Sequence, residues 1–201
     1  MRDKDQTTDI IESMKTLNRY IYHAAGIILL LDPLSIKGIR AELAENSYNA
    51  TKADSDISRE IISRVASVVF QGLSRSTRKK TIDIPLAITF SKVDLLQDVL
   101  GNDSPVYQPS RHQGFFNLRD FKNINANIHN WIKKSETKLL GATGVFQDIA
   151  FFGISALGCD PIPTEVAPDE IKKKMPYEPR PIRVEDPFLW LLYENNFING
   201  K

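Results

Sequence analysis

The chain has 201 residues, of which 42% are hydrophobic and 25% are charged, as in an ordinary globular protein. Its 26 basic and 25 acidic residues leave a formal net charge of +1, which gives no compositional support to nucleic-acid or membrane-surface binding. The single cysteine, Cys159, excludes an internal disulfide. The polar start does not resemble a signal peptide, and no apolar run is long enough to span a bilayer, so we expect a cytoplasmic protein.

The first half of the chain predicts helices on either side of a buried strand. Apolar residues recur at spacings of three and four from Thr8 to His23, which indicates an amphipathic helix. The continuous apolar run from Ile27 to Leu31 is typical of a strand buried on both faces of a parallel sheet. The polar residues 37–54 are expected to form an irregular helix or an insertion. A second amphipathic helix follows over residues 56–73.

The second half repeats this alternation of strand and helix. Residues 84–90 form a second apolar run, and the following loop, residues 101–116, is rich in Gly, Asn, Ser and Pro. A helix is expected from Leu118 to Ile132, and a third strand over residues 145–154. A proline-rich connection then leads to a last helix, for which Asp186 is the expected N-cap because a proline follows it.

This order of elements predicts an α/β fold of three layers, in which helices cover both faces of a mostly parallel sheet. Ligands of such sheets bind outside the carboxyl ends of the strands. In this sequence those ends are Asp32, residues 91–94 and residues 155–157. Asp32 has two interpretations, a magnesium ligand or a turn residue, and the proline that follows it favours the turn.

Two of these strand ends resemble the base-recognition motifs of P-loop GTPases of the Ras-like and translation-factor-related class. The string Ser91-Lys92-Val93-Asp94 is similar to the (N/T)KxD motif, with serine in place of asparagine or threonine. The string Ser155-Ala156-Leu157 is similar to the Ser-Ala motif that follows one helix and one strand later in that class. The resemblance implies that guanine is bound by Ser91, Lys92, Asp94, Ser155, Ala156 and Leu157.

The residue types at these positions suit guanine. The Asp94 carboxylate can accept hydrogen bonds from N1–H and from the exocyclic amine, whereas adenine has no matching pair of donors. The aliphatic part of Lys92 can lie along the purine while its ammonium group stays in solvent. The small side chain of Ala156 lets its backbone N–H approach guanine O6. In the class, the residue at the position of Ser91 ties this loop to the phosphate loop and the last strand, and serine can also donate such a bond.

The flanking segments extend the resemblance over most of the chain. Residues 24–34 resemble a strand typical of large bacterial GTPase-like proteins, and residues 183–192 resemble their closing helix. The resemblance implies a partial P-loop NTPase fold, a single incomplete GTPase-like domain over residues 1–201. Its expected parts are the fourth and fifth strand units in residues 1–100, a loop insertion in 101–116, and the sixth strand unit with the closing helix in 117–201.

The phosphate-binding part of that class is missing from the sequence. No GxxxxGK(S/T) string occurs, and the DxxG match at residues 98–101 follows the base motif instead of preceding it. The chain is therefore expected to begin just after the switch region and not to hydrolyse GTP by itself. We expect GTP or GDP as the ligand, with Mg²⁺ bound only when a phosphate-binding half is supplied. The source of that half would be an N-terminal GTPase half or a partner protein.

Two other functions stay open. The chain could be an α/β protein-interaction scaffold that does not bind nucleotide, in which case substitution of Asp94 would change nothing. An enzyme of unrelated chemistry has no supporting residues, since no Ser–His–acid arrangement is recognisable. The three histidines, His23, His112 and His129, also lack the spacing of metal ligands.

Overall fold

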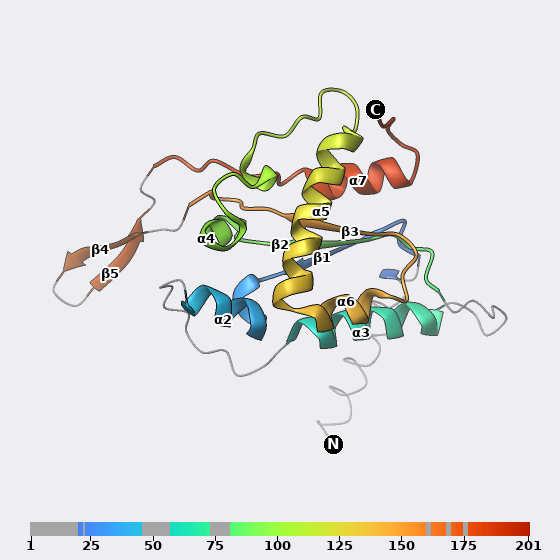
Figure 1. The fold of residues 1–201 in the computed structure, drawn as a ribbon, viewed down its shortest axis with the longest axis horizontal. Helices are drawn as coiled ribbons and strands as arrows, with labels where there is room; N and C mark the ends of the chain where they lie inside the picture. Colours follow the sequence, from blue (N-terminus) through green and yellow to red (C-terminus); the bar gives the residue numbers. More distant parts are fainter. Residues whose placement is uncertain are drawn as a thin grey trace, which may run out of the picture.

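A three-stranded parallel sheet forms the centre of the fold (Figure 1). Its strands are β1 (Ile27–Leu31), β2 (Leu86–Phe90) and β3 (Ile149–Gly153), and they lie in the order β1-β2-β3. The computed structural model describes residues 20–21, 23–45, 57–72, 81–159, 162–167, 170–174 and 177–201. The helix expected over residues 8–23 lies almost entirely outside these ranges.

The three strands form where the apolar runs predict them. β2 is buried along its whole length, as expected for a central strand of a covered parallel sheet. The predicted third strand, residues 145–154, is too long, because its first residues belong to a turn in which the N–H of Phe146 donates to Thr143. Phe146 instead makes an isolated parallel bridge with Ile82.

The helices cover the sheet in the two outer layers that the alternation predicts. On one face, four helices pack against Leu86, Ile88 and Phe90 of β2 and Phe151 of β3. These helices are α2 (Lys37–Glu45), α3 (Ile57–Gly72), α5 (Leu118–Ser135) and α6 (Thr137–Thr143). Short turns join them: η1 (Pro33–Ser35), η2 (Val93–Leu96), α4 (Gln97–Leu100) and η3 (Pro105–Tyr107).

The opposite face of the sheet is covered by the last helix, α7 (Asp186–Glu194). Trp190 of α7 packs with the alternate side chains of the strands, Ala87, Ala150 and Phe152, and with Phe116. The α/β fold class is therefore confirmed, with two cores separated by the sheet.

The cover on the α7 side does not extend over β1. Ile28 and Leu30 point to that face and are 43% and 58% exposed. Among the described residues, β1 pairs only with β2, so its other edge is unpaired within that part of the chain. An open edge beside exposed apolar side chains favours pairing with another chain segment.

A hairpin that the sequence does not predict follows β3. Its strands are β4 (Ile162–Ala167) and β5 (Glu170–Lys174), which pair antiparallel to each other in a separate sheet. Figure 1 shows this hairpin projecting from the side of the molecule. The prediction of a plain proline-rich connection here is wrong.

A buried ion cluster joins α5, α7 and the loop 101–116. Arg183 is only 4% exposed, and its guanidinium group donates to Asp120 Oδ2 at 3.0 Å and to Asp186 Oδ2 at 2.9 Å. It also donates to the carbonyl oxygens of Val106 and Pro105. The prediction that Asp186 caps α7 is wrong, since Glu185 is the N-cap residue and the Asp186 carboxylate is bound by Arg183 instead.

None of the helices in the described part of the chain is both long enough and apolar enough to cross a membrane.

Candidate functional site

The carboxyl ends of the three parallel strands lie side by side, and the predicted base motifs stand at two of them. The backbone N–H of Val93, in the first motif, donates to Ile154 at the end of β3 at 2.9 Å. The N–H of Ser91 donates to Leu31 at the end of β1, also at 2.9 Å. The structure thus brings the segments 91–94 and 155–157 together at one edge of the sheet.

The first motif is a tight turn after β2. Lys92 has a φ of 52°, in the left-handed region, which costs a residue with a side chain about 1–3 kcal/mol. The Ser91 hydroxyl donates to the carbonyl oxygen of Leu31 at 3.2 Å. Ser91 therefore ties the motif to the end of β1, within this chain, rather than to a phosphate loop as the resemblance implies.

Asp32, at the end of β1, is linked to the first motif. Its Oδ2 lies 2.6 Å from Lys92 Nζ, and its Oδ1 accepts a hydrogen bond from the N–H of Leu34 at 3.0 Å. Asp32 is the N-cap of η1, with a proline in the first turn. The turn interpretation of Asp32 is therefore confirmed.

The Asp94 carboxylate has an oxygen without a partner. Its Oδ1 is buried and makes no hydrogen bond to any described residue. A buried carboxylate oxygen left in this state costs about 1–3 kcal/mol, or more when the group is charged. An N–H donor that reached this carboxylate would offset that cost, and the resemblance implies that guanine supplies such donors to Asp94.

Tyr107 supports the first motif from the loop 101–116. Its hydroxyl donates to the carbonyl oxygen of Val93 at 3.0 Å. Burial raises the pKa of Tyr107 far above its usual value, and the charges of Asp94 and Asp98 raise it further. The hydroxyl therefore keeps its proton and remains a donor at every physiological pH. Sequence reasoning missed this residue, which lies in what reads as an ordinary polar loop.

The second motif is a turn that closes β3. Ser155 is 3% exposed, pairs with Ile182 in an antiparallel bridge, and accepts the N–H of Gly158 at its Oγ at 2.9 Å. Gly158 has a φ of 72°, and a Cβ there would collide with the carbonyl of Arg180. Ser155 is thus a buried residue that shapes the turn.

The next two residues of the second motif face outward. Ala156 and Leu157 are both exposed. Within the described residues, the backbone hydrogen bonds of this turn do not use the N–H of Ala156. That N–H is the group expected to donate to guanine O6.

The segment after the hairpin adds Tyr177 to this neighbourhood. Arg180 lies over the Tyr177 ring, 5.8 Å from its centroid, and the N–H of Arg180 donates to Leu157 at 2.9 Å. A hydrogen bond with Cys159 is the main cause that raises the pKa of Tyr177, and the charge of Asp94 adds to it. Tyr177 is 52% exposed, so this aromatic ring is available beside the two motifs.

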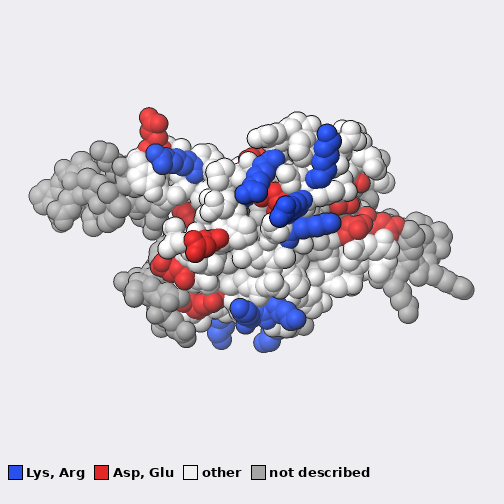
Figure 2. Space-filling model, turned by 45° about the horizontal axis from the view of Figure 1, so that its top comes forward, with Lys and Arg blue, Asp and Glu red and all other residues white. Residues whose placement is uncertain are grey.

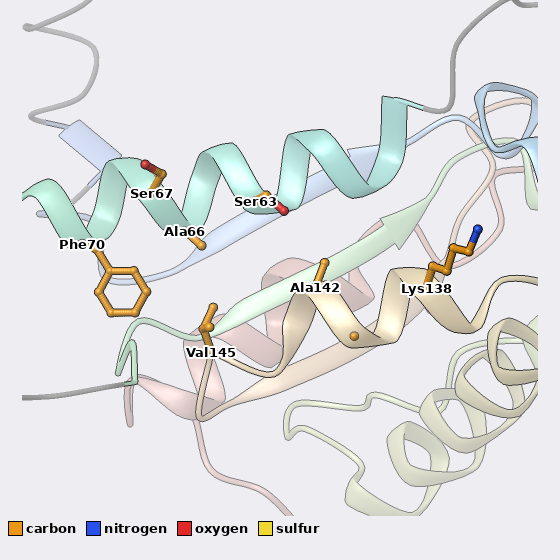
Figure 3. A pocket seen from close by; sticks show the side chains of 8 residues that line it. Ser63, Ala66, Ser67, Phe70, Lys138, Ala142 and Val145 are labelled. Atoms are coloured by element: carbon orange, nitrogen blue, oxygen red, sulfur yellow. The ribbon is translucent and has the colours of Figure 1, made fainter.

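A groove with a volume of about 650 Å³ lies away from the strand ends, between α3 and α6. Figure 3 shows Lys138 at one end of this groove and Phe70 with Val145 at the other. Among the described residues that line it, Lys138 is the one ionisable side chain, and these residues offer no acid–base pair. Its lining residues are Ser63, Ala66, Ser67, Phe70, Lys138, Gly141, Ala142 and Val145.

In the part of the chain that the structure describes, no three His, Cys, Asp or Glu side chains come together as metal ligands. On the face shown in Figure 2, several basic side chains lie close together above the centre and others lie along the lower edge, with acidic side chains on either side of them.

Comparisons with known proteins add no relative to these observations. No protein-family model matches the chain, and neither a curated protein nor a solved structure is significantly similar to it.

Proposed function

We propose that this chain is the guanine-recognition half of a GTPase-like protein and that it does not hydrolyse nucleotide by itself. The observation that carries the proposal is the meeting of the two motifs at neighbouring strand ends. At the first motif, the buried Asp94 Oδ1 has no hydrogen-bond partner among the described residues. GTP or GDP is the proposed ligand. The absence of a GxxxxGK(S/T) string from the sequence is the reason for proposing no hydrolysis.

The donors and acceptors at the site complement the edge of guanine. Guanine offers N1–H and an exocyclic amine to the Asp94 carboxylate, and its O6 accepts from the N–H of Ala156. Adenine would leave the carboxylate oxygen buried and unpaired. Sites built to bond a particular donor reject analogues without it more strongly than apolar pockets do. The site is therefore expected to prefer guanine nucleotides to adenine nucleotides through its contacts with the base.

The open edge of β1 is the proposed position of the phosphate-binding half. In the class that the sequence resembles, the strand that carries the phosphate loop flanks the strand equivalent to β1. Ile28 and Leu30 are exposed apolar side chains on the face of β1, which such a half could cover. That half would supply the ligands of phosphate and Mg²⁺, whether it comes from an N-terminal segment or from a partner protein.

A protein-interaction scaffold is the second candidate function. Large apolar side chains stand exposed on β1, α7 and the C-terminal segment, and such side chains mark interaction surfaces when they are contiguous. They are Leu30, Phe188 and Phe197, with exposed fractions of 58%, 57% and 72%. If the chain is a scaffold, substitution of Asp94 should leave its binding to partner proteins unchanged.

The substitution Asp94→Asn tests the proposed contact directly. The amide can donate where the carboxylate could only accept, so the preference should shift from guanine toward xanthine. We expect GDP affinity to fall about tenfold or more, and affinity for xanthosine diphosphate to rise above it. Calorimetric titration with both nucleotides measures the ratio of the two affinities.

The matched control is Asp98→Asn, which changes the same charge at an exposed neighbouring position and should keep the preference for GDP. Equal affinity for both nucleotides in Asp94→Asn would count against this geometry.

A further inference from the structure

The base motif is anchored to the end of β1 by bonds within this chain. Leu31 accepts both the N–H and the hydroxyl of Ser91, at 2.9 and 3.2 Å. One residue further along each strand, Asp32 Oδ2 meets Lys92 Nζ at 2.6 Å. Three polar contacts therefore fix the first motif against β1 without any phosphate loop.

Asp32 is itself held rigidly. Its Oδ1 accepts the N–H of Leu34 at 3.0 Å, and its carbonyl oxygen accepts the Ser35 hydroxyl at 2.7 Å. The next residue, Pro33, is buried. This carboxylate, held through Oδ1 on a constrained backbone, can serve as an anchor for a longer side chain.

Lys92 has the longer and more exposed side chain of this pair. Its side chain is 52% exposed, and a lysine side chain loses more rotamer freedom than most when it is held in place. The ion pair draws the ammonium group from the end of β2 toward the end of β1. An aliphatic stem held at both its backbone and its ammonium end can offer an apolar surface to a flat ligand. An exposed pair of this kind adds little to folding stability, so ordering of Lys92 is its main consequence.

We propose that Asp32 is a positioning residue, which holds the Lys92 stem in place as one wall of the base site. This inference rests on the proposed function. The two proposals concern different contacts. In the proposed function Asp94 forms hydrogen bonds with the edge of the base, whereas in this inference Asp32 acts through Lys92, which lies against the face of the base. Substitution of Asp32 should therefore lower the affinity for different purines by the same factor, whichever groups the edge of the base carries.

The test uses guanosine and inosine, which lack phosphates, so that the charge of Asp32 cannot act on the ligand. Inosine lacks only the exocyclic amine that Asp94 would bind. The substitution Asp32→Asn keeps an oxygen that can accept the N–H of Leu34 and removes the charge that holds Lys92. We expect it to weaken guanosine and inosine equally, by about threefold, with an unchanged melting temperature. Asp94→Ala should weaken guanosine more than inosine, because guanosine loses the bonds of both N1–H and the amine whereas inosine loses only that of N1–H. Saturation-transfer NMR titrations measure these affinities.

Two controls separate positioning from a general effect. Asp103→Asn makes the same charge change at an exposed loop position and should leave both affinities unchanged. In a Lys92→Met background, Asp32→Asn should have no further effect, because Lys92 is the group through which Asp32 acts.

Each outcome decides between the two proposals. If the chain binds guanosine better than inosine while Asp32→Asn binds both as the unmodified chain does, the positioning role is overturned and the proposed function stands. A threefold loss that persists in the Lys92→Met background would also overturn the positioning role. If the unmodified chain does not prefer guanosine to inosine, the proposed function and this inference are both overturned.

Discussion

Replacing Asp94 with alanine is expected to abolish the preference of the chain for guanine nucleotides. The carboxylate is the group that would bond N1–H and the amine, and hydrogen bonds to a charged group contribute about 1.5–3 kcal/mol. The loss corresponds to about a tenfold or greater fall in GDP affinity. Folding should be preserved, because Asp94 Oδ1 makes no hydrogen bond to a described residue, and its removal leaves no new unpaired donor there. Titration of the variant with GDP and ADP measures the effect.

The matched control is Asp98→Ala, which removes a nearby exposed carboxylate. It should retain the GDP preference. An Asp94→Ala variant that is folded and binds GDP as tightly as the control would contradict the assignment of Asp94 and favour the scaffold.

The second large effect is expected in folding. Replacing Arg183 with methionine should destabilise the chain by about 3–5 kcal/mol, because it leaves the carboxylates of Asp120 and Asp186 buried without their cation. These two side chains are only 7% and 2% exposed. Arg183 also has a φ of 48°, so the chain holds it in a left-handed conformation in order to place the guanidinium group.

Urea denaturation followed by circular dichroism measures this destabilisation, as a lower midpoint. The control is Arg119→Met, an exposed cation on the same helix as Asp120, which should change stability by less than about 0.5 kcal/mol. A cost below about 1 kcal/mol for Arg183→Met would show that the cluster contributes little and that its carboxylates find other partners.

The central sheet and its strand ends were predictable from the sequence. Unbroken apolar runs predict buried parallel strands because both faces of each strand must be covered, and β1 and β2 form within those runs. The meeting of the two motif segments was predictable for the same reason, since the carboxyl ends of neighbouring parallel strands lie at one edge of the sheet. All six predicted residues lie in the turns that follow β2 and β3.

The contacts that hold those turns in place were not predictable. Tyr107 reaches Val93 from a loop of polar composition, and nothing in its local pattern indicates that partner. Arg183 and Asp120 are 63 positions apart, and a helix start such as Asp186-Pro187 predicts a cap when no distant cation is known. The β4–β5 hairpin was missed because its sequence is polar and contains Pro163, which argues against a strand.

The most direct test of guanine recognition is a calorimetric titration of the purified chain with GDP and with ADP, both in the presence of Mg²⁺. Without a phosphate loop, GDP should bind weakly, with a Kd of about 1 mM, which corresponds to about −4 kcal/mol. ADP should not bind measurably, because the Asp94 carboxylate would stay unpaired. Equal affinity for the two nucleotides, or no binding of either to a folded monomer, would contradict the proposal that these strand ends recognise guanine.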